Sequence, residues 1–202
     1  MIPDRPAVVA ILLAAGLSRR MGRPKQTLAW GESTLVMAVG AQIAAMGLPV
    51  VAVVPEWLKE PVPLWARAWI VNPQPEQGLS GSIRLGVQAA EALGRWEAMA
   101  FFLADQPFVT EADTAVVLEA FWRRQPTVHA VRPLYNGHPG HPVVVDRVVW
   151  SAADQLDGDA GFGRWLKEGL ELVPVAVEGR PDPATDLDTW EDYQRYRNAA
   201  KD

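Results

Sequence analysis

One stretch decides the fold: Leu13-Ala14-Ala15-Gly16-Leu17-Ser18-Arg19-Arg20-Met21-Gly22-Arg23-Pro24-Lys25. It follows a continuous apolar run, residues 7–13, which has the composition of a fully buried strand. The small residues after the strand let backbone N–H groups approach a phosphate or a base edge, and Arg20 and Lys25 can neutralise phosphate charge. Neither GxxxxGK[ST] nor GxGxxG is present, which disfavours a Walker A loop and a dinucleotide-binding dehydrogenase. A plain strand-to-loop turn with a solvated basic run is the alternative.

Apolar periodicity predicts that strands and helices alternate through the rest of the chain. Strands are expected at residues 49–54, 68–71, 98–103, 128–132, 142–145 and 172–177. Helices are expected at 32–46 and 81–93, after Thr110 with Asp113 as its capping-box partner, and from Asp188 or Thr189. This alternation favours an α/β fold whose mainly parallel sheet is covered on both faces. Because ligands bind outside the carboxyl ends of such strands, a site is expected at the loops that carry Gly16, Asp105 and Asp186.

Composition limits the class of protein. The chain has 202 residues, of which 49% are hydrophobic and 21% charged, and this length suits a single domain over residues 1–202. The cysteine count of 0 excludes disulfides, thiolate metal sites and a cysteine nucleophile. A formal charge of −5 disfavours binding to a nucleic acid polymer. The apolar run near the N-terminus is too short to span a bilayer, so we expect a cytoplasmic protein with no membrane partner.

Acidic side chains follow the predicted strands. Asp105 ends the strand at 98–103, where a carboxylate is well placed to hold Mg²⁺, a hard cation that takes oxygen ligands. The alternative is an aspartate that accepts backbone hydrogen bonds in a turn before a proline. Further on, Asp188 can cap the last helix, which would leave Asp186 free as a second metal ligand.

Two other loops carry candidate residues. The turn that contains Gly78 and Ser82 leads into a helix, whose N-terminus is a natural anion site. The loop at residues 136–142 holds two of the three histidines. A zinc site would need a third ligand, and His129 lacks supporting spacing, so the loop is interpreted as presenting His141 to a substrate.

Five segments, taken in order, resemble the molybdenum cofactor nucleotidyltransferases, and most closely the cytidylyltransferases among them. Residues 13–25 are similar to LAAGxSxRMGxPK, 72–86 to NPxxxxGxSxSLxxG, 103–107 to a DQP element, 140–142 to GHP and 186–192 to DIDTPED. Thr27 and Ile83 each stand where leucine is expected, and Trp190 where proline is usual. The pattern GDxGAR, which starts at Gly158, has its arginine displaced by one residue, to Arg164.

The resemblance implies a three-layer, Rossmann-like nucleotidyltransferase fold with a mainly parallel mixed sheet. It implies catalytic roles for Arg20, Lys25 and Asp105. Mg²⁺, or Mn²⁺ in its place, would be held by Asp105 with Asp186 or Asp188. The implied nucleotide-binding residues are Leu13, Ala14, Ala15, Gly16, Lys25, Asn72, Gly78 and Ser82, and the implied acceptor-binding residues are Gly140, His141 and Asp159.

The resemblance also implies a reaction. The LAAG form is the cytidine type within the family, so Ala15 points to CTP. The enzyme would transfer CMP to the terminal phosphate of molybdenum-bound molybdopterin, release pyrophosphate and form molybdopterin cytosine dinucleotide, which a molybdoenzyme receives. The alternatives are a related transferase that uses GTP or another phosphorylated acceptor, and a non-catalytic cofactor carrier. A carrier needs neither Lys25 nor Asp105.

Overall fold

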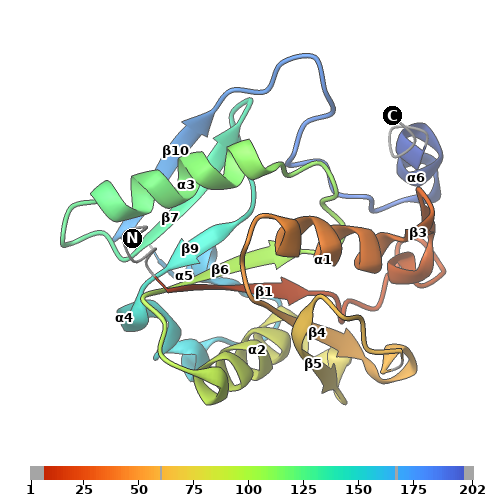
Figure 1. The fold of residues 1–202 in the computed structure, drawn as a ribbon, viewed down its shortest axis with the longest axis horizontal. Helices are drawn as coiled ribbons and strands as arrows, with labels where there is room; N and C mark the ends of the chain where they lie inside the picture. The colour runs from red at the N-terminus through yellow and green to blue at the C-terminus, as the bar shows by residue number, and fades with distance from the viewer. Residues whose placement is uncertain (1–6, 60, 167, 198–202) are drawn as a thin grey trace.

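The computed structural model describes residues 7–59, 61–166 and 168–197, and a mixed sheet of eight strands organises them (Figure 1). The path β10-β7-β9-β6-β1-β4-β5 runs across the sheet, and β8 pairs with β7 beside it. Of these strands, β9 and β8 run antiparallel to their neighbours and the others are parallel. The strands are β1 (Val8–Leu13), β4 (Val50–Pro55), β5 (Ala66–Asn72), β6 (Ala98–Leu103), β7 (Ala130–Tyr135), β8 (His138–Pro139), β9 (Val143–Val145) and β10 (Leu170–Val175).

Helices cover both faces of the sheet, as the alternation of elements predicts (Figure 1). One face packs against α1 (Leu35–Ala45), α3 (Glu111–Arg123) and α6 (Trp190–Tyr196). The other packs against α2 (Leu79–Leu93), α4 (Arg147–Trp150) and α5 (Phe162–Trp165). Among the described residues, none of the helices has the length and apolar character needed to cross a membrane. The expected three-layer α/β arrangement is confirmed.

The central strand β1 explains why both faces can be covered. All six of its residues are buried, and they alternate between two hydrophobic clusters, with Leu12 on one side and Ile11 on the other. A strand that is apolar on both faces has no solvent side, so it must lie between two helical layers. Its carboxyl end therefore delivers the loop after Leu13 to the rim of the sheet, next to the loop that follows β6.

Some element boundaries differ from those expected. The helix expected at 32–46 begins only at Leu35, because Gly31 (φ 59°) makes a turn after which β3 (Ser33–Thr34) pairs with β2 (Ala29–Trp30). Strand β7 starts at Ala130, two residues later than expected, and continues through Pro133 to Tyr135. Pro133 has no N–H to donate to the sheet, but its carbonyl accepts a hydrogen bond from Gly140 N, and β8 pairs with the two residues that follow it.

The capping residues of two helices can be compared with those expected from the sequence. Thr110 and Asp113 form the predicted reciprocal capping box at the start of α3. Helix α6 is capped in the same way by Thr189 with Asp192. The cap of α6 is therefore Thr189, and the alternative in which Asp188 caps this helix is wrong. Tyr193 of α6 then donates a hydrogen bond to the Ala29 carbonyl at 2.9 Å, which brings the C-terminal segment beside the first loop.

Candidate functional site

A pocket of about 550 Å³ lies at the carboxyl ends of β1 and β6. Most of the residues expected to bind a nucleotide or to take part in catalysis line it: Leu13, Ala14, Ala15, Gly16, Arg20, Lys25, Gly78, Ser82, Asp105 and Asp188. Asp159, expected on the acceptor side, lines the same pocket. Asn72, Gly140, His141 and Asp186 are not among the lining residues.

The loop after β1 is held in shape by Gln26, a residue that the sequence reading missed. Gln26 is buried, and its Nε2 donates hydrogen bonds to the carbonyls of Ala14 (2.9 Å) and Gly16 (2.6 Å). Ser18 adopts a left-handed conformation (φ 52°), and its Oγ accepts a hydrogen bond from Lys25 N at 3.1 Å. These contacts fold the loop back on itself, so that Lys25 returns to the carboxyl end of β1. The only signal in the sequence is a polar residue directly after Lys25.

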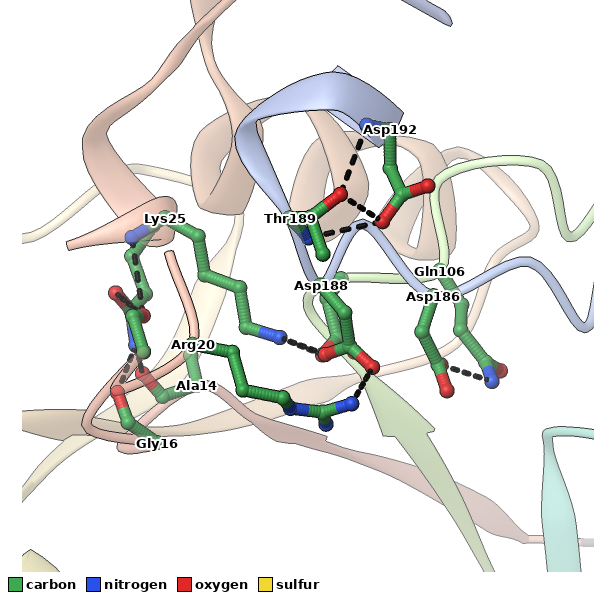
Figure 2. A network of polar contacts seen from close by, with 12 residues as sticks. Ala14, Gly16, Arg20, Lys25, Gln106, Asp186, Asp188, Thr189 and Asp192 are labelled. Atoms are coloured by element: carbon green, nitrogen blue, oxygen red, sulfur yellow. Dashed lines mark hydrogen bonds and ion pairs between the residues drawn. The ribbon is translucent and has the colours of Figure 1, made fainter. Parts of the chain in front are cut away.

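Lys25 lines the pocket and pairs with two carboxylates that also line it, and Figure 2 shows its contact with one of them, Asp188. Its Nζ forms ion pairs with Asp105 and with Asp188, the latter at 3.2 Å. Arg20 Nη1 lies 2.6 Å from the other oxygen of Asp188. The side chains of Lys25, Asp105 and Asp188 are only 14%, 18% and 19% exposed, so solvent screens these charges weakly.

Burial and the two neighbouring carboxylates act on the pKa of Lys25 in opposite directions. Burial alone lowers the pKa of Lys25, but the negative charges and hydrogen bonds of Asp105 and Asp188 outweigh it and raise the pKa above its ordinary value. Lys25 is therefore a permanent cation at neutral pH. With Arg20 it supplies two positive charges against the two carboxylates.

The donor set suits a divalent metal that arrives with phosphates. Among the described residues, no three His, Cys, Asp or Glu side chains gather into a group that could hold a metal alone. Asp105 and Asp188 meet at one cation, the Lys25 ammonium, and so present two oxygen donors towards the same space. Mg²⁺ is bound through one or two carboxylates together with substrate phosphates and waters, which matches this arrangement.

Asp186 occupies a different position from Asp188. Its Oδ1 accepts a hydrogen bond from Gln106 Nε2 at 2.8 Å, and its side chain points away from Lys25 and Arg20 (Figure 2). Asp186 is nevertheless near the same group, because burial and the negative charge of Asp105 raise its pKa to about 6. Asp188 differs in that it shares the Lys25 ammonium with Asp105.

The far wall of the pocket is the start of α2. Gly78 has φ 84° and no room for a side chain, since a Cβ there would lie 2.6 Å from Asp159 Oδ1 and from the Gly158 carbonyl. Ser80 N donates a hydrogen bond to that carbonyl at 3.0 Å. Asn72 does not line the pocket itself, but its Nδ2 donates a hydrogen bond at 3.0 Å to the Oγ of Ser82, which does. The loop with Asp159 thus packs directly against the start of α2, which carries residues expected to bind the nucleotide.

Gln106 and His141 form a polar link beside the pocket. Gln106 is buried, and its Oε1 lies 3.1 Å from His141 Nδ1. Burial, together with the positive charge of Arg132, lowers the pKa of His141 to about 3. His141 is therefore neutral at physiological pH, where its Nδ1–H can donate to the Gln106 oxygen. His129 lies apart from this link, with its Nδ1 3.0 Å from Asp146.

The low pKa of His141 makes stability depend on pH. The unfolded chain binds a proton at this residue below about pH 6.5, whereas the folded protein does so only near pH 3. Stability from this group is thus present above about pH 6.5 and falls with pH by up to about 1.4 kcal/mol per unit. We expect His141→Gln to lose less stability than the wild type between pH 6.5 and pH 4 in urea unfolding. Parallel losses in the two proteins would contradict a His141 that stays neutral in the folded state.

A second prediction concerns Gln26. Gln26→Leu leaves the carbonyls of Ala14 and Gly16 without their donor, so we expect the free energy of unfolding to fall by about 1–3 kcal/mol. Nucleotide affinity should also fall about tenfold, because the loop loses its shape. The matched control is Gln42→Leu, which removes a similar bond to the Val109 carbonyl away from the pocket residues. If both variants bind nucleotide equally well, Gln26 does not position the loop.

Comparison with known proteins shows which family this chain belongs to. Residues 10–174 match the MobA-like NTP transferase domain. The chain belongs to the MobA-like NTP transferase family. It is a nucleotidyltransferase, and the pocket with Lys25 and Asp105 is its candidate active site.

Curated relatives match over nearly the whole chain. The purine catabolism protein PucB of Bacillus subtilis is 28% identical over 96% of this chain and 98% of its own length. The molybdenum cofactor cytidylyltransferase of Escherichia coli is 26% identical over 93% and 94%. The nicotine blue oxidoreductase of Paenarthrobacter nicotinovorans is 29% identical over 96% and 97%. These three relatives have nearly equal sequence identity to this chain, and their names describe different activities.

Solved structures share the fold. Rv0371c from Mycobacterium tuberculosis H37Rv superposes with a TM-score of 0.77 at 22% identity, over 96% of this chain and 98% of that one. Its complex with manganese gives a TM-score of 0.75 at 21% identity, over 96% and 99%.

Proposed function

We propose that this MobA-like NTP transferase moves CMP from CTP to the terminal phosphate of molybdenum-bound molybdopterin. Pyrophosphate leaves, and molybdopterin cytosine dinucleotide, a cofactor for a molybdoenzyme, is formed. The observation that carries the proposal is the Lys25 ammonium held between Asp105 and Asp188 in the lining of the pocket. A phosphate clamp and a pair of metal-binding acids are what nucleotidyl transfer requires.

The residues of the site can perform this transfer by an exchange of charges. Lys25 and Arg20 are paired with Asp105 and Asp188 in the structure. When the triphosphate enters, its oxygens take over the two cations, and the carboxylates become free to serve as metal ligands. Mg²⁺, or Mn²⁺ in its place, would bind there and offset negative charge on the transferring and leaving phosphates.

No general base is needed in this reaction. A phosphate monoester is already anionic at neutral pH and acts as the nucleophile itself. The protein must hold it in line with the α-phosphate and keep Lys25 close to the charge that develops there. The raised pKa of Lys25 keeps the ammonium charged throughout.

Ala15 supports a pyrimidine nucleotide. Ala14 and Ala15 are both buried and line the pocket beside Gly16. The Ala15 methyl takes up space that a glycine would leave to a larger base. The cytidylyltransferase of E. coli, matched over almost its full length, supports the same choice.

The rival reading from another class is a redox protein, because one relative is named as an oxidoreductase. Lys25, Asp105 and Asp188 speak against it here, since a hydride transfer does not use a triphosphate clamp with paired metal ligands. The two readings separate in one assay: the transferase releases pyrophosphate from CTP when molybdenum-bound molybdopterin and Mg²⁺ are present. A cofactor carrier would bind the same acceptor and release none.

The nucleotide preference is tested by thermal unfolding with Mg²⁺ and either CTP or GTP. A ligand that binds only the folded state raises its apparent stability, so CTP should raise the Tm more than GTP does. Ala15→Gly should narrow or reverse that difference, whereas Arg23→Ala, an exposed change in the same loop outside the pocket lining, should keep the order. A larger shift with GTP in the wild type would contradict the cytidine assignment.

A further inference from the structure

Arg132 of β7 carries a partly buried charge for which no partner acid is found in the described part of the chain. Its Nη2 donates to the Gly140 carbonyl at 3.0 Å, while its buried Nε has no hydrogen-bond partner there. Burial lowers the pKa of Arg132, and no carboxylate opposes that shift. By contrast, Arg124 pairs with Asp146 and Arg180 with Asp113. An uncompensated, partly buried cation costs stability, which calls for a reason to keep it.

The guanidinium lies where the sequence departs from the GDxGAR pattern that it otherwise resembles. In the pattern GDxGAR, read from Gly158, the arginine falls at position 163, and this chain has Gly163 there. A Cβ at Gly163 would lie 2.6 Å from Arg132 Nη1. The glycine therefore makes room for a guanidinium that reaches the same place from β7.

The same guanidinium is close to the loop that GHP residues form next to the active site. It bonds to Gly140, and its charge helps to keep the adjacent His141 neutral. His141 in turn contacts Gln106, which directly follows Asp105. Arg132 is not among the residues that line the nucleotide pocket, so its charge is not one of those that face a nucleotide there.

We propose that Arg132 forms an oxyanion subsite for the acceptor, which binds a negatively charged group other than the phosphate that attacks the nucleotide. This deepens the proposed function and rests on it for the existence of an acceptor. A guanidinium presents N–H donors in a fixed fork that matches a tetrahedral oxyanion. Phosphate and molybdate share that chemistry, and both serve as probes.

The test first fills the nucleotide pocket with Mg²⁺ and α,β-methylene CTP, so that Lys25 and Arg20 are occupied. Phosphate or molybdate is then added, and the Tm is measured. The wild type should gain a further shift of about 2–4 °C at saturation. Arg132→Met should lose this shift, and Arg132→Lys should keep only part of it. The exposed Arg147→Met is the control and should behave as the wild type. The anion that gives the larger shift identifies the group bound.

A merely structural role for Arg132 predicts different results. If the residue only held Gly140, Arg132→Met would lower the Tm of the empty protein. We expect a Tm that is unchanged or higher, because an unpaired charge is removed. The double variant Arg132→Ala with Gly163→Arg should regain the anion shift by supplying the guanidinium from α5. No anion shift in the wild type, or an undiminished one in Arg132→Met, would overturn the subsite.

Kinetics separates this inference from the proposed function. With molybdenum-bound molybdopterin and CTP, Arg132→Met should raise the KM for the acceptor at least about tenfold while the KM for CTP stays unchanged. If the wild type releases no pyrophosphate but the anion shift depends on Arg132, the proposed function fails and the subsite stands. If the wild type turns over and Arg132→Met leaves the acceptor KM unchanged, the subsite fails and the function stands.

Discussion

Asp105→Asn is expected to lower turnover by about 10³-fold, because it removes a charged ligand from the metal that offsets phosphate charge. The amide keeps the shape of the side chain, and Lys25 still pairs with Asp188, so the fold should remain intact. The measurement is steady-state pyrophosphate release at saturating CTP and acceptor.

Two comparisons secure that interpretation. The stabilisation by CTP should lose most of its Mg²⁺ dependence in Asp105→Asn and keep it in Asp154→Asn, an exposed change on the same protein. Circular dichroism should show the same fold in both variants. An Asp105→Asn enzyme that retains most of its rate would rule out the assignment of Asp105 as a metal ligand.

Lys25→Met is expected to lower kcat/KM by about 10²–10³-fold, since a preorganised charge at the phosphates is lost. Lys25→Arg should retain part of the activity because it keeps the charge but not its shape. Lys25→Met should also change the stability of the protein measured without nucleotide or metal. Asp105 then loses its partner cation and Asp188 keeps only Arg20, so the Tm should fall.

The empty Lys25→Met protein also offers a check that needs no substrate. Mg²⁺ alone should stabilise it more than it stabilises the wild type, because the ammonium no longer occupies the space between the two carboxylates. An equal response of both proteins to Mg²⁺ would mean that the two acids do not form a joint site. The exposed Lys59→Met, which removes a charge remote from the pocket residues, is the control.

Much of the fold and the outline of the site can be predicted from local signals. The apolar run that forms β1 has no solvent face, and it fixes the position of the loop from Ala14 to Lys25. Asp105 follows directly from the end of β6. These residues lie next to regular elements whose period is visible in the sequence, so their location at the rim follows from the element itself.

Other parts of the site depend on contacts that no local pattern encodes. Asp186 and Asp188 differ by two positions in a loop without period, and only the packed structure separates the one at Gln106 from the one at Lys25. Gln26 looks like any polar residue until the carbonyls that it satisfies are known. Arg132 sits in a strand, and only the packed structure shows that its buried Nε has no hydrogen-bond partner among the described residues.

The candidate site combines residues from the beginning and from the end of the described chain, and this has a consequence for the order in which they are synthesised. Lys25 and Asp105 lie in the first 105 residues, whereas Asp188 arrives with the segment that bonds through Leu187 N to the Asp105 carbonyl and through Tyr193 to Ala29. Translation runs from the N-terminus, so the strands of the sheet leave the ribosome before Asp188 does. A chain cut short after β10 would hold the sheet without the carboxylate that shares Lys25 with Asp105. On the proposed function, activity therefore requires that synthesis has passed Asp188.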